Sequence, residues 1–358
     1  MRRLRVGVVG GGVGVSHIDA YQQLPDHYEV AAICDIDAAR AQKIASEKNV
    51  AKSTTRLADL LALDLDLVDI ATPSSLHFAQ ATEALRAGRN VALEKPAAAS
   101  LAEIDELAAT VKASGKTLVP IFQYRFANGL QKFLHLKARG LVGKPYVATV
   151  ETHWRRRAAY YATWHGTWAG ELGGCLVTLA IHGHDIMTQV MGPAASVFAR
   201  VATRVNPIET EDCVAASLEM QSGALATLSV TTGSAVEQSR LRFCFEGLLV
   251  ESGRDPYNPG SDPWTFAAEG EAAQKRIDEA LAEFVPLKYQ RWLGQIEGIY
   301  NALTGGAPPP VTLDDARASI ELLTAAYCSS RIGQSVKLPI GRDHPYYRGW
   351  QPSAAGEV

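Results

Sequence analysis

The feature that most constrains this chain is a cluster of glycines directly after a short apolar segment near the amino terminus. Residues 4–9 (LRVGVV) are mostly apolar and β-branched, which is typical of a strand buried on both faces. Residues 10–14 (GGGVG) follow, and residues 17–24 then have helical spacing. Glycine lets the backbone approach a phosphate closely, and the start of a helix offers N–H groups and the positive end of its dipole. We therefore predict a dinucleotide-binding turn whose contacts come from Gly10, Gly12, Val13 and Gly14.

An acidic residue follows the second predicted strand at the distance that such a site requires. Residues 30–34 form a second apolar run, and Asp35 comes 21 residues after Gly14. A carboxylate here accepts hydrogen bonds from the adenosine ribose and repels a 2′-phosphate. NAD is therefore the predicted cofactor, and NADP is the less favoured alternative because Arg40 is near. The third glycine comes one residue earlier than in the strict G-x-G-x-x-G pattern, so an ordinary tight turn is the competing interpretation.

Strand-like and helix-like segments alternate up to Arg125. Residues 67–71, 91–93 and 117–122 have the pattern of strands, and residues 37–48, 76–87 and 102–113 have the pattern of helices. This alternation predicts right-handed crossovers and a doubly wound parallel α/β sheet, the Rossmann fold, over residues 1–125.

The remainder of the chain, residues 126–358, has the pattern of a different fold. Strand-like segments joined by short turns predict a large, mostly antiparallel open sheet from residues 144–155, 195–205, 212–220, 224–232 and 240–246. Helices are expected at residues 174–190, 289–303 and 314–331. The second domain is therefore predicted to be α+β, with its last helix packing back toward the Rossmann domain.

The composition excludes several classes of partner. A formal net charge of −3 provides no positive surface for nucleic acid or an anionic membrane. No apolar stretch reaches the roughly 18 residues that a membrane span needs. The five cysteines are scattered without a CxxC pair, which argues against a disulfide framework and a zinc site. We expect a cytoplasmic protein that binds neither nucleic acid nor membrane and holds no metal.

Several segments further along the chain have the pattern of a known family. They are residues 71–77 (ATPSSLH), residues 84–96 (ALRAGRNVALEKP), residues 123–126 (QYRF), Gly173-Gly174 through His182 and Asp185, and residues 325–339. Together they resemble the glucose-fructose oxidoreductase, inositol dehydrogenase and rhizopine-catabolism (Gfo/Idh/MocA) family over nearly the whole chain. The resemblance implies NAD(P)-dependent oxidation of a hydroxyl on a sugar, polyol or related ring, and a homodimer or homotetramer assembled through the second sheet. It also implies cofactor contacts from Thr72, Pro73, His77, Glu94 and Lys95.

Lys95 and His182 are the candidate catalytic residues. Glu94 and Lys95 end a buried strand, at the edge where ligands of parallel sheets bind, and Pro96 restricts the backbone of Lys95. A solvated ion pair at a strand end is the alternative. The resemblance implies that a histidine, here His182, lies beside this lysine at the nicotinamide. We expect His182 to accept the hydroxyl proton while Lys95 donates a hydrogen bond to the developing alkoxide.

His182 belongs to a polar stripe on its predicted helix. Thr178, His182, Asp185 and Gln189 recur at helical spacing among apolar residues, as expected of a helix that lines a site. A core histidine with a capping aspartate is the alternative, and His184, which lies off the stripe, is expected to be structural. Many relatives have aspartate at the position of Thr178, so inositol-dehydrogenase specificity does not carry over directly.

An aromatic and arginine-rich segment precedes that helix, beginning at Trp154. Its rings suit the apolar face of a sugar, and its arginines suit an anionic substituent. Packing of the rings on the sheet and solvation of the arginines are the alternatives. The predicted substrate residues are Tyr124, Arg125, Trp154, Arg156, Tyr161, Trp164, Thr178 and Asp185.

The sequence supports two functions. The first is an NAD-dependent oxidoreductase that oxidises a secondary hydroxyl of a sugar, glycoside or cyclitol. The alternative is an NAD-dependent glycoside-cleaving enzyme that oxidises, eliminates, hydrates and re-reduces its substrate, including an anionic glycoside. A ligand-sensing protein without activity is disfavoured because Lys95 and His182 are both present.

Overall fold

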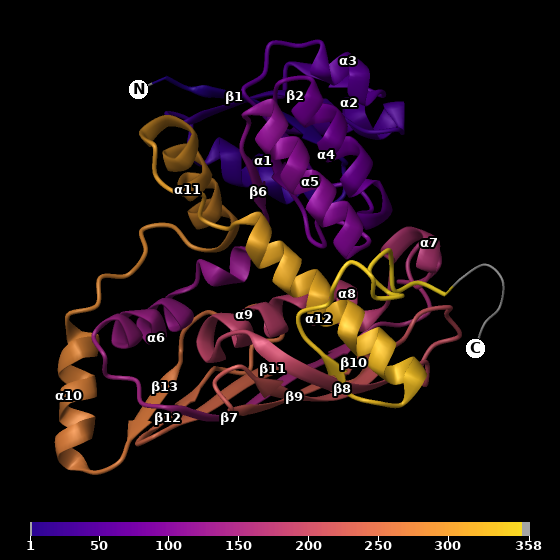
Figure 1. The fold of residues 1–358 in the computed structure, drawn as a ribbon. Coiled ribbons are helices and arrows are strands. Elements are labelled where there is room, and N and C mark those ends of the chain that lie inside the picture. Colours follow the sequence, from indigo (N-terminus) through magenta and orange to yellow (C-terminus); the bar gives the residue numbers. More distant parts are fainter. Residues whose placement is uncertain (1, 353–358) are drawn as a thin grey trace. The chain divides into compact units, whose positions relative to one another are not determined.

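The computed structural model describes residues 2–352, which form two compact units. The first unit contains the residues up to Gln123 together with Tyr289–Arg317, and the second contains Tyr124–Lys288 and the residues from Ala318 onward. Each unit has its own β-sheet (Figure 1), and each is described by itself.

The first unit is built on a six-stranded parallel sheet in the order β3-β2-β1-β4-β5-β6. Its strands are β1 (Leu4–Val9), β2 (Tyr28–Cys34), β3 (Lys52–Thr54), β4 (Leu67–Ile70), β5 (Asn90–Leu93) and β6 (Leu118–Pro120). The central residues of every strand except the edge strand β3 are buried, which accounts for their nearly continuous apolar sequences. β3 is the polar, mostly exposed segment KST. The strand order reverses between β1 and β4, and sheets of this kind bind ligands at the carboxyl ends of the strands near that point. The predicted doubly wound fold is confirmed.

Helices connect the successive strands of this sheet. They are α1 (Gly14–Gln22), α2 (Ala38–Glu47), α3 (Leu57–Leu61), the 3-10 turn η1 (Ser74–Leu76), α4 (His77–Arg86), α5 (Leu101–Ser114) and the 3-10 turn η2 (Gln123–Arg125) where the chain leaves the unit. The ends of α5 follow from its sequence. Ser100 Oγ accepts a hydrogen bond from Glu103 N at 3.1 Å, and Glu103 accepts one from Ala99 N at 2.7 Å. Gly115 then ends the helix with a φ of 63°.

Helix α11 (Arg291–Gly305) belongs to the first unit, whereas the predicted boundary had assigned all of residues 126–358 to the second domain. The buried amide of Gln295 explains the difference. It accepts a hydrogen bond from Phe122 N at 3.0 Å and donates one to Pro120 O at 2.7 Å. The sequence pattern could not reveal these contacts because the partners are 173 and 175 positions apart.

The second unit is built on an eight-stranded sheet in the order β13-β12-β11-β7-β10-β9-β8-β14. Its strands are β7 (Pro145–Arg155), β8 (Ala194–Ala202), β9 (Cys213–Met220), β10 (Leu225–Thr231), β11 (Gly233–Phe245), β12 (Leu248–Glu251), β13 (Thr265–Ala268) and β14 (Val336–Lys337). All neighbouring pairs are antiparallel except β7 and β10. The predicted large, mostly antiparallel sheet is confirmed. Strand β11 begins well before the predicted Arg240, because an irregular register between Gly233 and Gln238 hides its start in the sequence pattern.

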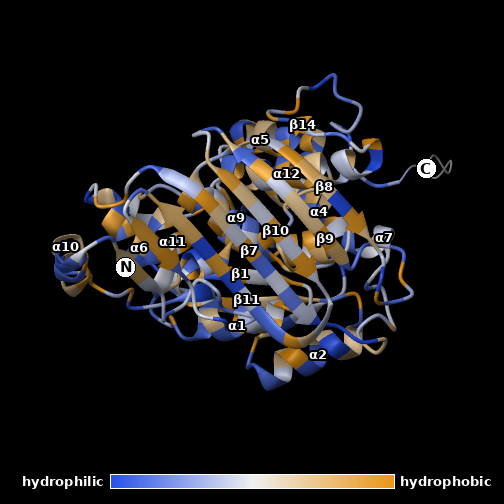
Figure 2. Ribbon diagram, turned by 90° about the horizontal axis from the view of Figure 1, so that it is seen from below, coloured by the Kyte–Doolittle hydropathy of each residue, from blue (hydrophilic) through white to orange (hydrophobic). Residues whose placement is uncertain are grey.

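Helices lie over one face of this sheet (Figure 1), and Figure 2 views the molecule from the side of its other face. Leu225, Val147 and Leu249 of its strands are exposed apolar residues. The helices of this unit are α6 (Asn128–Ala138), α7 (Trp168–Glu171), α8 (Cys175–Thr178), α9 (Ile181–Met191), α10 (Glu271–Ala282) and most of α12 (Leu313–Ile332). Helix α9 packs against β7 and β11. On the outer face, Leu225, Val147, Cys244 and Leu249 lie in register across β10, β7, β11 and β12.

The predicted helix over residues 174–190 is two helices, α8 and α9, with a break at Leu179 and Ala180. Ala180 N donates to Cys175 O at 2.9 Å, five residues back instead of the usual four. This wider turn offsets the helical register. Thr178 is therefore not part of α9, and the predicted polar stripe is limited on that helix to His182, Asp185 and Gln189.

Within residues 2–352, no helix is both long enough and apolar enough to cross a membrane. The same part of the chain contains no group of three or more His, Cys, Asp or Glu side chains arranged to hold a metal ion.

Candidate active site

The turn between β1 and α1 has the backbone geometry of a phosphate-binding site. Gly10 has a φ of 102°, and a Cβ added to it would lie 2.5 Å from Ala71 O, so only glycine fits there. A Cβ on Gly12 would meet nothing within 4 Å, so its backbone is open to approach. A Cβ on Gly14 would lie 3.0 Å from Val8 Cγ1, so glycine also permits close packing of α1 on β1. No side chain of the described residues caps α1, and its first N–H groups suit an anion.

Asp35 closes this turn from the end of β2. Its Oδ2 accepts a hydrogen bond from Gly11 N at 2.7 Å, and its Oδ1 accepts one from Asp37 N at 2.9 Å. Arg40 Nη1 lies 3.6 Å from Asp35 Oδ2, and the Arg40 side chain is 54% exposed. The carboxylate therefore both shapes the turn and carries negative charge beside it, with a cation close by. The contact with Gly11 was not predicted, since the sequence shows the spacing of an acid but not which amide it binds.

His77 links the loops that follow β4 and β5. Its Nδ1 lies 2.7 Å from Pro96 O, and its Nε2 lies 2.9 Å from Thr72 O. Burial lowers the pKa of His77, so the neutral ring donates a hydrogen bond to one of these two carbonyls. Thr72 Oγ1 donates to Gln80 Oε1 at 2.7 Å, and Pro73 precedes the 3-10 turn η1. The ring of His77, which stays a predicted cofactor contact, joins the backbone of two loops at the carboxyl edge of the sheet.

Glu94 and Lys95 follow β5 at the same edge of the sheet as the glycine turn. Glu94 N donates to Ile70 O at 2.9 Å, which extends the pairing with β4 by one residue. The Glu94 side chain is buried, and its Oε2 accepts a hydrogen bond from Lys95 N at 3.0 Å. The peptide bond between Lys95 and Pro96 is cis. A buried glutamate is inconsistent with the alternative of a solvated ion pair at a strand end.

A buried network contacts Glu94 from inside the unit. His17 Nδ1 lies 2.9 Å from Asp69 Oδ1, and His17 Nε2 lies 3.2 Å from Glu94 Oε1. Tyr21 OH donates to Asp69 Oδ2 at 2.7 Å. Burial by itself lowers the pKa of His17, but Asp69 and Glu94 outweigh it and raise the pKa to about 10, so the ring is a cation near neutral pH. This network was not predicted, although Asp69 was a signal, because a charged residue within a buried apolar strand needs a partner.

In the second unit, His182 lies in the first turn of α9 and is 5% exposed. The ring of Tyr124 stacks on it, with centroids 4.2 Å apart and an angle of 20° between the planes. Gly183 brings this part of α9 close to the sheet, since a Cβ there would lie 3.1 Å from Val150 Cγ1. His184 is buried, and burial lowers its pKa to about 3, so this ring is neutral and fits the expected structural role.

Arg125 and Asp185 form a buried bidentate ion pair. Arg125 Nε lies 2.8 Å from Asp185 Oδ2 and Nη2 lies 2.6 Å from Oδ1, with side chains 11% and 4% exposed. The Gln189 amide oxygen, in the orientation that faces the guanidinium, accepts from Arg125 Nη2 at 3.0 Å. Thr178 Oγ1 donates to Gly174 O at 2.9 Å. Two residues of the polar stripe of α9, Asp185 and Gln189, therefore hold Arg125 within this unit.

Arg156 lies among aromatic rings just after β7. Its guanidinium carbon is 5.2 Å from the centroid of Trp154, 5.3 Å from that of Tyr160 and 5.7 Å from that of Tyr257. Arg156 Nη1 lies 3.1 Å from Glu237 Oε1. This arginine, predicted to bind an anionic substituent, already has a carboxylate partner. Trp154 is buried in β7, which favours the alternative that this ring packs on the sheet.

The segment between β7 and α7 is held by Glu171. His165 Nδ1 lies 2.8 Å from Glu171 Oε1, and the ring of Trp164 contacts that of His165 with centroids 4.0 Å apart. Trp164 is 43% exposed, whereas Tyr161 is half-buried and its hydroxyl donates to Thr232 Oγ1 at 3.4 Å. Of the aromatic residues predicted to contact substrate, Trp164 thus presents the most open ring within this unit.

Glu211 was not predicted and orders the segment that leads to His182. Its Oε2 accepts from Gly174 N and its Oε1 from Leu176 N, both at 2.9 Å, and Tyr327 OH donates to it at 2.8 Å. Burial raises the pKa of Glu211. A glutamate between two predicted strands gives no local signal of this role, because its partners come from distant segments.

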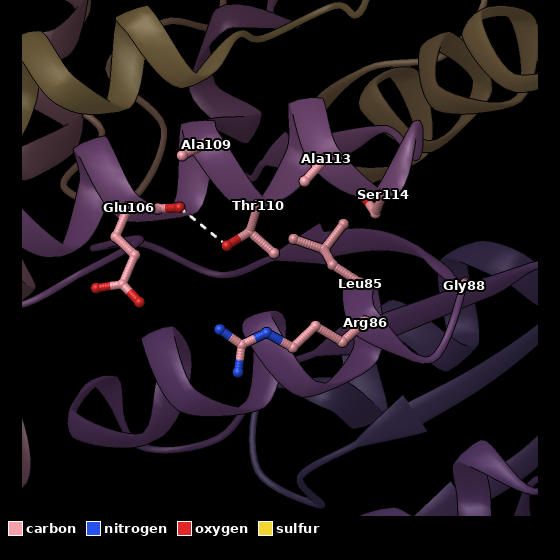
Figure 3. A pocket seen from close by; sticks show the side chains of 8 residues that line it. All are labelled: Leu85, Arg86, Gly88, Glu106, Ala109, Thr110, Ala113 and Ser114. Atoms are coloured by element: carbon pink, nitrogen blue, oxygen red, sulfur yellow. Dashed lines mark hydrogen bonds between the residues drawn. The ribbon is translucent and has the colours of Figure 1, made fainter.

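A groove of about 500 Å³ lies between α4 and α5, away from these residues (Figure 3). It is lined by Leu85, Arg86, Gly88, Glu106, Ala109, Thr110, Ala113 and Ser114. Helices α4 and α5 end here, just before the chain enters β5 and β6. The groove is therefore at the amino edge of the parallel sheet, opposite the edge that carries the glycine turn, and it is not part of the candidate active site.

Two family models match this chain. The oxidoreductase family with the NAD-binding Rossmann fold matches residues 4–122, and the GFO/IDH/MocA C-terminal domain matches residues 130–247. Together they cover more than half of the chain, which therefore belongs to the Gfo/Idh/MocA family of oxidoreductases, as the resemblance predicted.

Individual relatives agree with this assignment. D-glucoside 3-dehydrogenase of Escherichia coli is 26% identical, over 94% of this chain and 97% of that protein. An uncharacterized oxidoreductase of Synechocystis is 30% identical to this chain, and the match covers 64% of this chain and 66% of that protein. The WlbA dehydrogenase from Bordetella pertussis, solved with NADH and UDP-GlcNAcA, has a TM-score of 0.82 and 29% identity, covering 95% of this chain and 100% of that chain.

Proposed function

We propose that this protein uses NAD to oxidise a secondary hydroxyl of a sugar or a closely related ring. The observation that carries the proposal is the convergence of the glycine turn, Asp35 and the Glu94-Lys95 pair at the carboxyl edge of one parallel sheet. The relatives support the substrate class, because the names of several of them refer to sugar or inositol dehydrogenases.

The residues at the glycine turn fit a dinucleotide. Added side-chain atoms would block Gly10, while the backbone of Gly12 is open, so the chain can cradle a pyrophosphate there. Asp35 is held by two backbone amides with its charge beside the turn, which suits hydrogen bonds to a ribose diol. NAD, when bound, supplies the hydride acceptor for the oxidation.

NAD is preferred to NADP in this proposal because the Asp35 carboxylate repels a 2′-phosphate. Arg40 is the feature that opposes this preference, since its guanidinium is half-exposed and 3.6 Å from the carboxylate. The D-xylose dehydrogenase of Haloferax volcanii, 26% identical to this chain, is an NADP enzyme by name, so both cofactors belong in the assay.

The chain's own residues manage the proton and the developing charge. We assign His182 as the base that accepts the hydroxyl proton, and Lys95 as the donor of a hydrogen bond to the same oxygen. Tyr124 supports the orientation of the imidazole by stacking on it. The assignment requires that both groups reach one carbinol oxygen when substrate and cofactor are bound.

The contacts that the predicted substrate residues make within the protein bear on which of them we propose to touch the substrate. Arg125 with Asp185, and Arg156 with Glu237, already form ion pairs, so we propose that these side chains shape the substrate site. We propose that Arg156 in particular does not bind an anionic substituent. Trp164 is the ring we propose for stacking on a sugar, because it is the most exposed of the predicted aromatic set. Thr178 remains a proposed hydroxyl contact.

The test is NADH formation by the purified protein with a panel of aldoses, glycosides, cyclitols and nucleotide sugars, each with NAD and with NADP. Stoichiometric NADH and a keto product support the proposal. Release of an aglycone without net NADH would instead indicate the redox-neutral glycoside-cleaving reaction. Absence of both products across the panel would count against sugar oxidation.

We also propose that a second copy of the chain covers the outer face of the eight-stranded sheet, giving a homodimer or homotetramer. The exposed residues Leu225, Val147 and Leu249, with the half-buried Cys244 between them, support this, since such apolar rows on monomers mark interaction surfaces. Light scattering of the wild type and of Val147→Glu tests it, with a smaller particle expected for the variant. The five unpaired cysteines support the proposed cytoplasmic location.

A further inference from the structure

We propose that His17, together with Asp69, is a positioning residue for Lys95: its buried imidazole fixes the orientation of Glu94, which in turn fixes the backbone of Lys95. The kinetic part of this inference rests on the proposed function. The structural part concerns the first unit alone.

The geometry joins three elements that are distant in the sequence. His17 comes from the first full turn of α1, Asp69 from the middle of β4, and Glu94 from the residue after β5. The imidazole spans the two acids, with Nδ1 2.9 Å from Asp69 Oδ1 and Nε2 3.2 Å from Glu94 Oε1. His17 and Asp69 are fully buried and Glu94 is 5% exposed. No water is needed to complete this arrangement, because each ring nitrogen already faces a carboxylate.

The charge arrangement indicates why a histidine is needed here. Two carboxylates that are buried close together repel each other. Ionising both of them is costly in free energy unless a cation lies between them. The groups that face the His17 ring are Asp69, Glu94 and the side chain of Trp292 from α11, whose ring centroid is 5.6 Å away. Tyr21 adds a hydrogen bond to the far oxygen of Asp69. A protonated imidazole thus places a positive charge between the two acids.

The consequence for Lys95 follows from the two oxygens of Glu94. One oxygen lies against His17, and the other accepts the backbone N–H of Lys95 at 3.0 Å. The carboxylate therefore cannot rotate without losing one of these contacts. Glu94 holds the backbone N–H of Lys95. The direction in which the Lys95 side chain leaves the backbone is therefore set by the buried network.

The first test compares His17→Gln with the matched control Tyr21→Phe. Glutamine can keep a hydrogen bond but cannot carry the charge, whereas Tyr21→Phe removes a contact to Asp69 and leaves Glu94 with its partner. We expect His17→Gln to lower kcat by roughly 10- to 100-fold with the Kd for NAD changed by less than about threefold. Tyr21→Phe should keep kcat within about threefold of the wild type. Equal losses in both variants, or a loss in His17→Gln confined to NAD binding, would overturn the positioning role.

The second test uses the wild type, so it does not depend on the variant folding or on knowing the substrate. Nitrogen NMR of the histidine rings should show one imidazole that stays doubly protonated at about pH 8, far above the ordinary histidine pKa of about 6.5. That signal should be absent from His17→Gln. A wild-type spectrum in which every imidazole is neutral at that pH would overturn the inference. If the doubly protonated ring is present while no sugar is oxidised, the proposed function is contradicted, and the inference about the buried network of His17, Asp69 and Glu94 is supported.

Discussion

Replacing Gly12 with alanine separates the two reasons for which a glycine can be required in a turn. A glycine is needed either because the backbone is strained without it or because a ligand must approach closely. At Gly12 the first reason is absent, since an added Cβ would meet nothing within 4 Å and its φ is not in the left-handed region. At Gly10 both the φ of 102° and the contact with Ala71 O at 2.5 Å apply.

The expected magnitudes follow from this contrast. An unstrained Gly→Ala change stabilises a protein by about 0.4–1 kcal/mol through the unfolded state, so Gly12→Ala should unfold at the same temperature as the wild type or a little higher. A methyl group that prevents one backbone N–H from reaching a charged phosphate oxygen removes about 1.5–3 kcal/mol of binding. Since 1.4 kcal/mol corresponds to a factor of ten, the Kd for NAD should rise by roughly 10- to 100-fold.

Thermal unfolding measures the stability of each variant. Titration with NAD, monitored by tryptophan fluorescence or calorimetry, measures the Kd for NAD on the same samples. Gly10→Ala is the matched comparison, and it should lose stability by about 1–3 kcal/mol in addition to losing affinity. An unchanged Kd for NAD in a stable Gly12→Ala protein would refute the placement of the pyrophosphate at this turn.

Three further predictions concern charge. Asp35→Asn keeps one acceptor oxygen and should lose one of the two backbone contacts of the carboxylate. It should also reduce the preference for NAD over NADP by about tenfold or more, and an unchanged ratio of the two Kd values would argue against the ribose contact. Asp185→Asn should lower the free energy of unfolding by about 3 kcal/mol in urea titrations, because it leaves the buried guanidinium of Arg125 without its carboxylate. Burial lowers the pKa of His184 to about 3 in the folded protein. Below about pH 6.5, His184 is therefore protonated in the unfolded chain but not in the folded one. The free energy of unfolding should fall by about 1.4 kcal/mol per pH unit from this residue as the pH falls toward 3. His184→Gln should flatten that part of the stability profile, and parallel profiles would contradict it.

The parallel sheet was predictable because its strands carry their own signal. β1, β4 and β5 are covered on both faces, so they are continuous apolar runs, and their observed ends lie within a residue or so of the predicted ones. The position of the candidate site residues of this unit was predictable for a related reason. Glycines, an acid and a Glu-Lys pair directly after such strands must all lie at one edge of the sheet.

What the sequence could not predict depends on contacts between distant segments. The assignment of α11 to the first unit rests on Gln295, and the network around Glu94 rests on His17 and Asp69, which meet only in the folded chain. The break between α8 and α9 depends on one hydrogen bond with a longer spacing, which leaves the apolar periodicity almost unchanged. The ion pair between Arg125 and Asp185 likewise joins residues 60 positions apart.

The central claim is that Lys95 acts on a hydroxyl while NAD is bound at the glycine turn. The most direct measurement is the rate of NADH formation by wild type and Lys95→Met on the first substrate that the panel identifies, together with the Kd for NAD of each protein. We predict a fall in kcat of roughly 100- to 1,000-fold, which exceeds any rise in the Kd for NAD caused by the loss of the predicted cofactor contact of Lys95. Turnover of Lys95→Met at the wild-type rate would contradict the account.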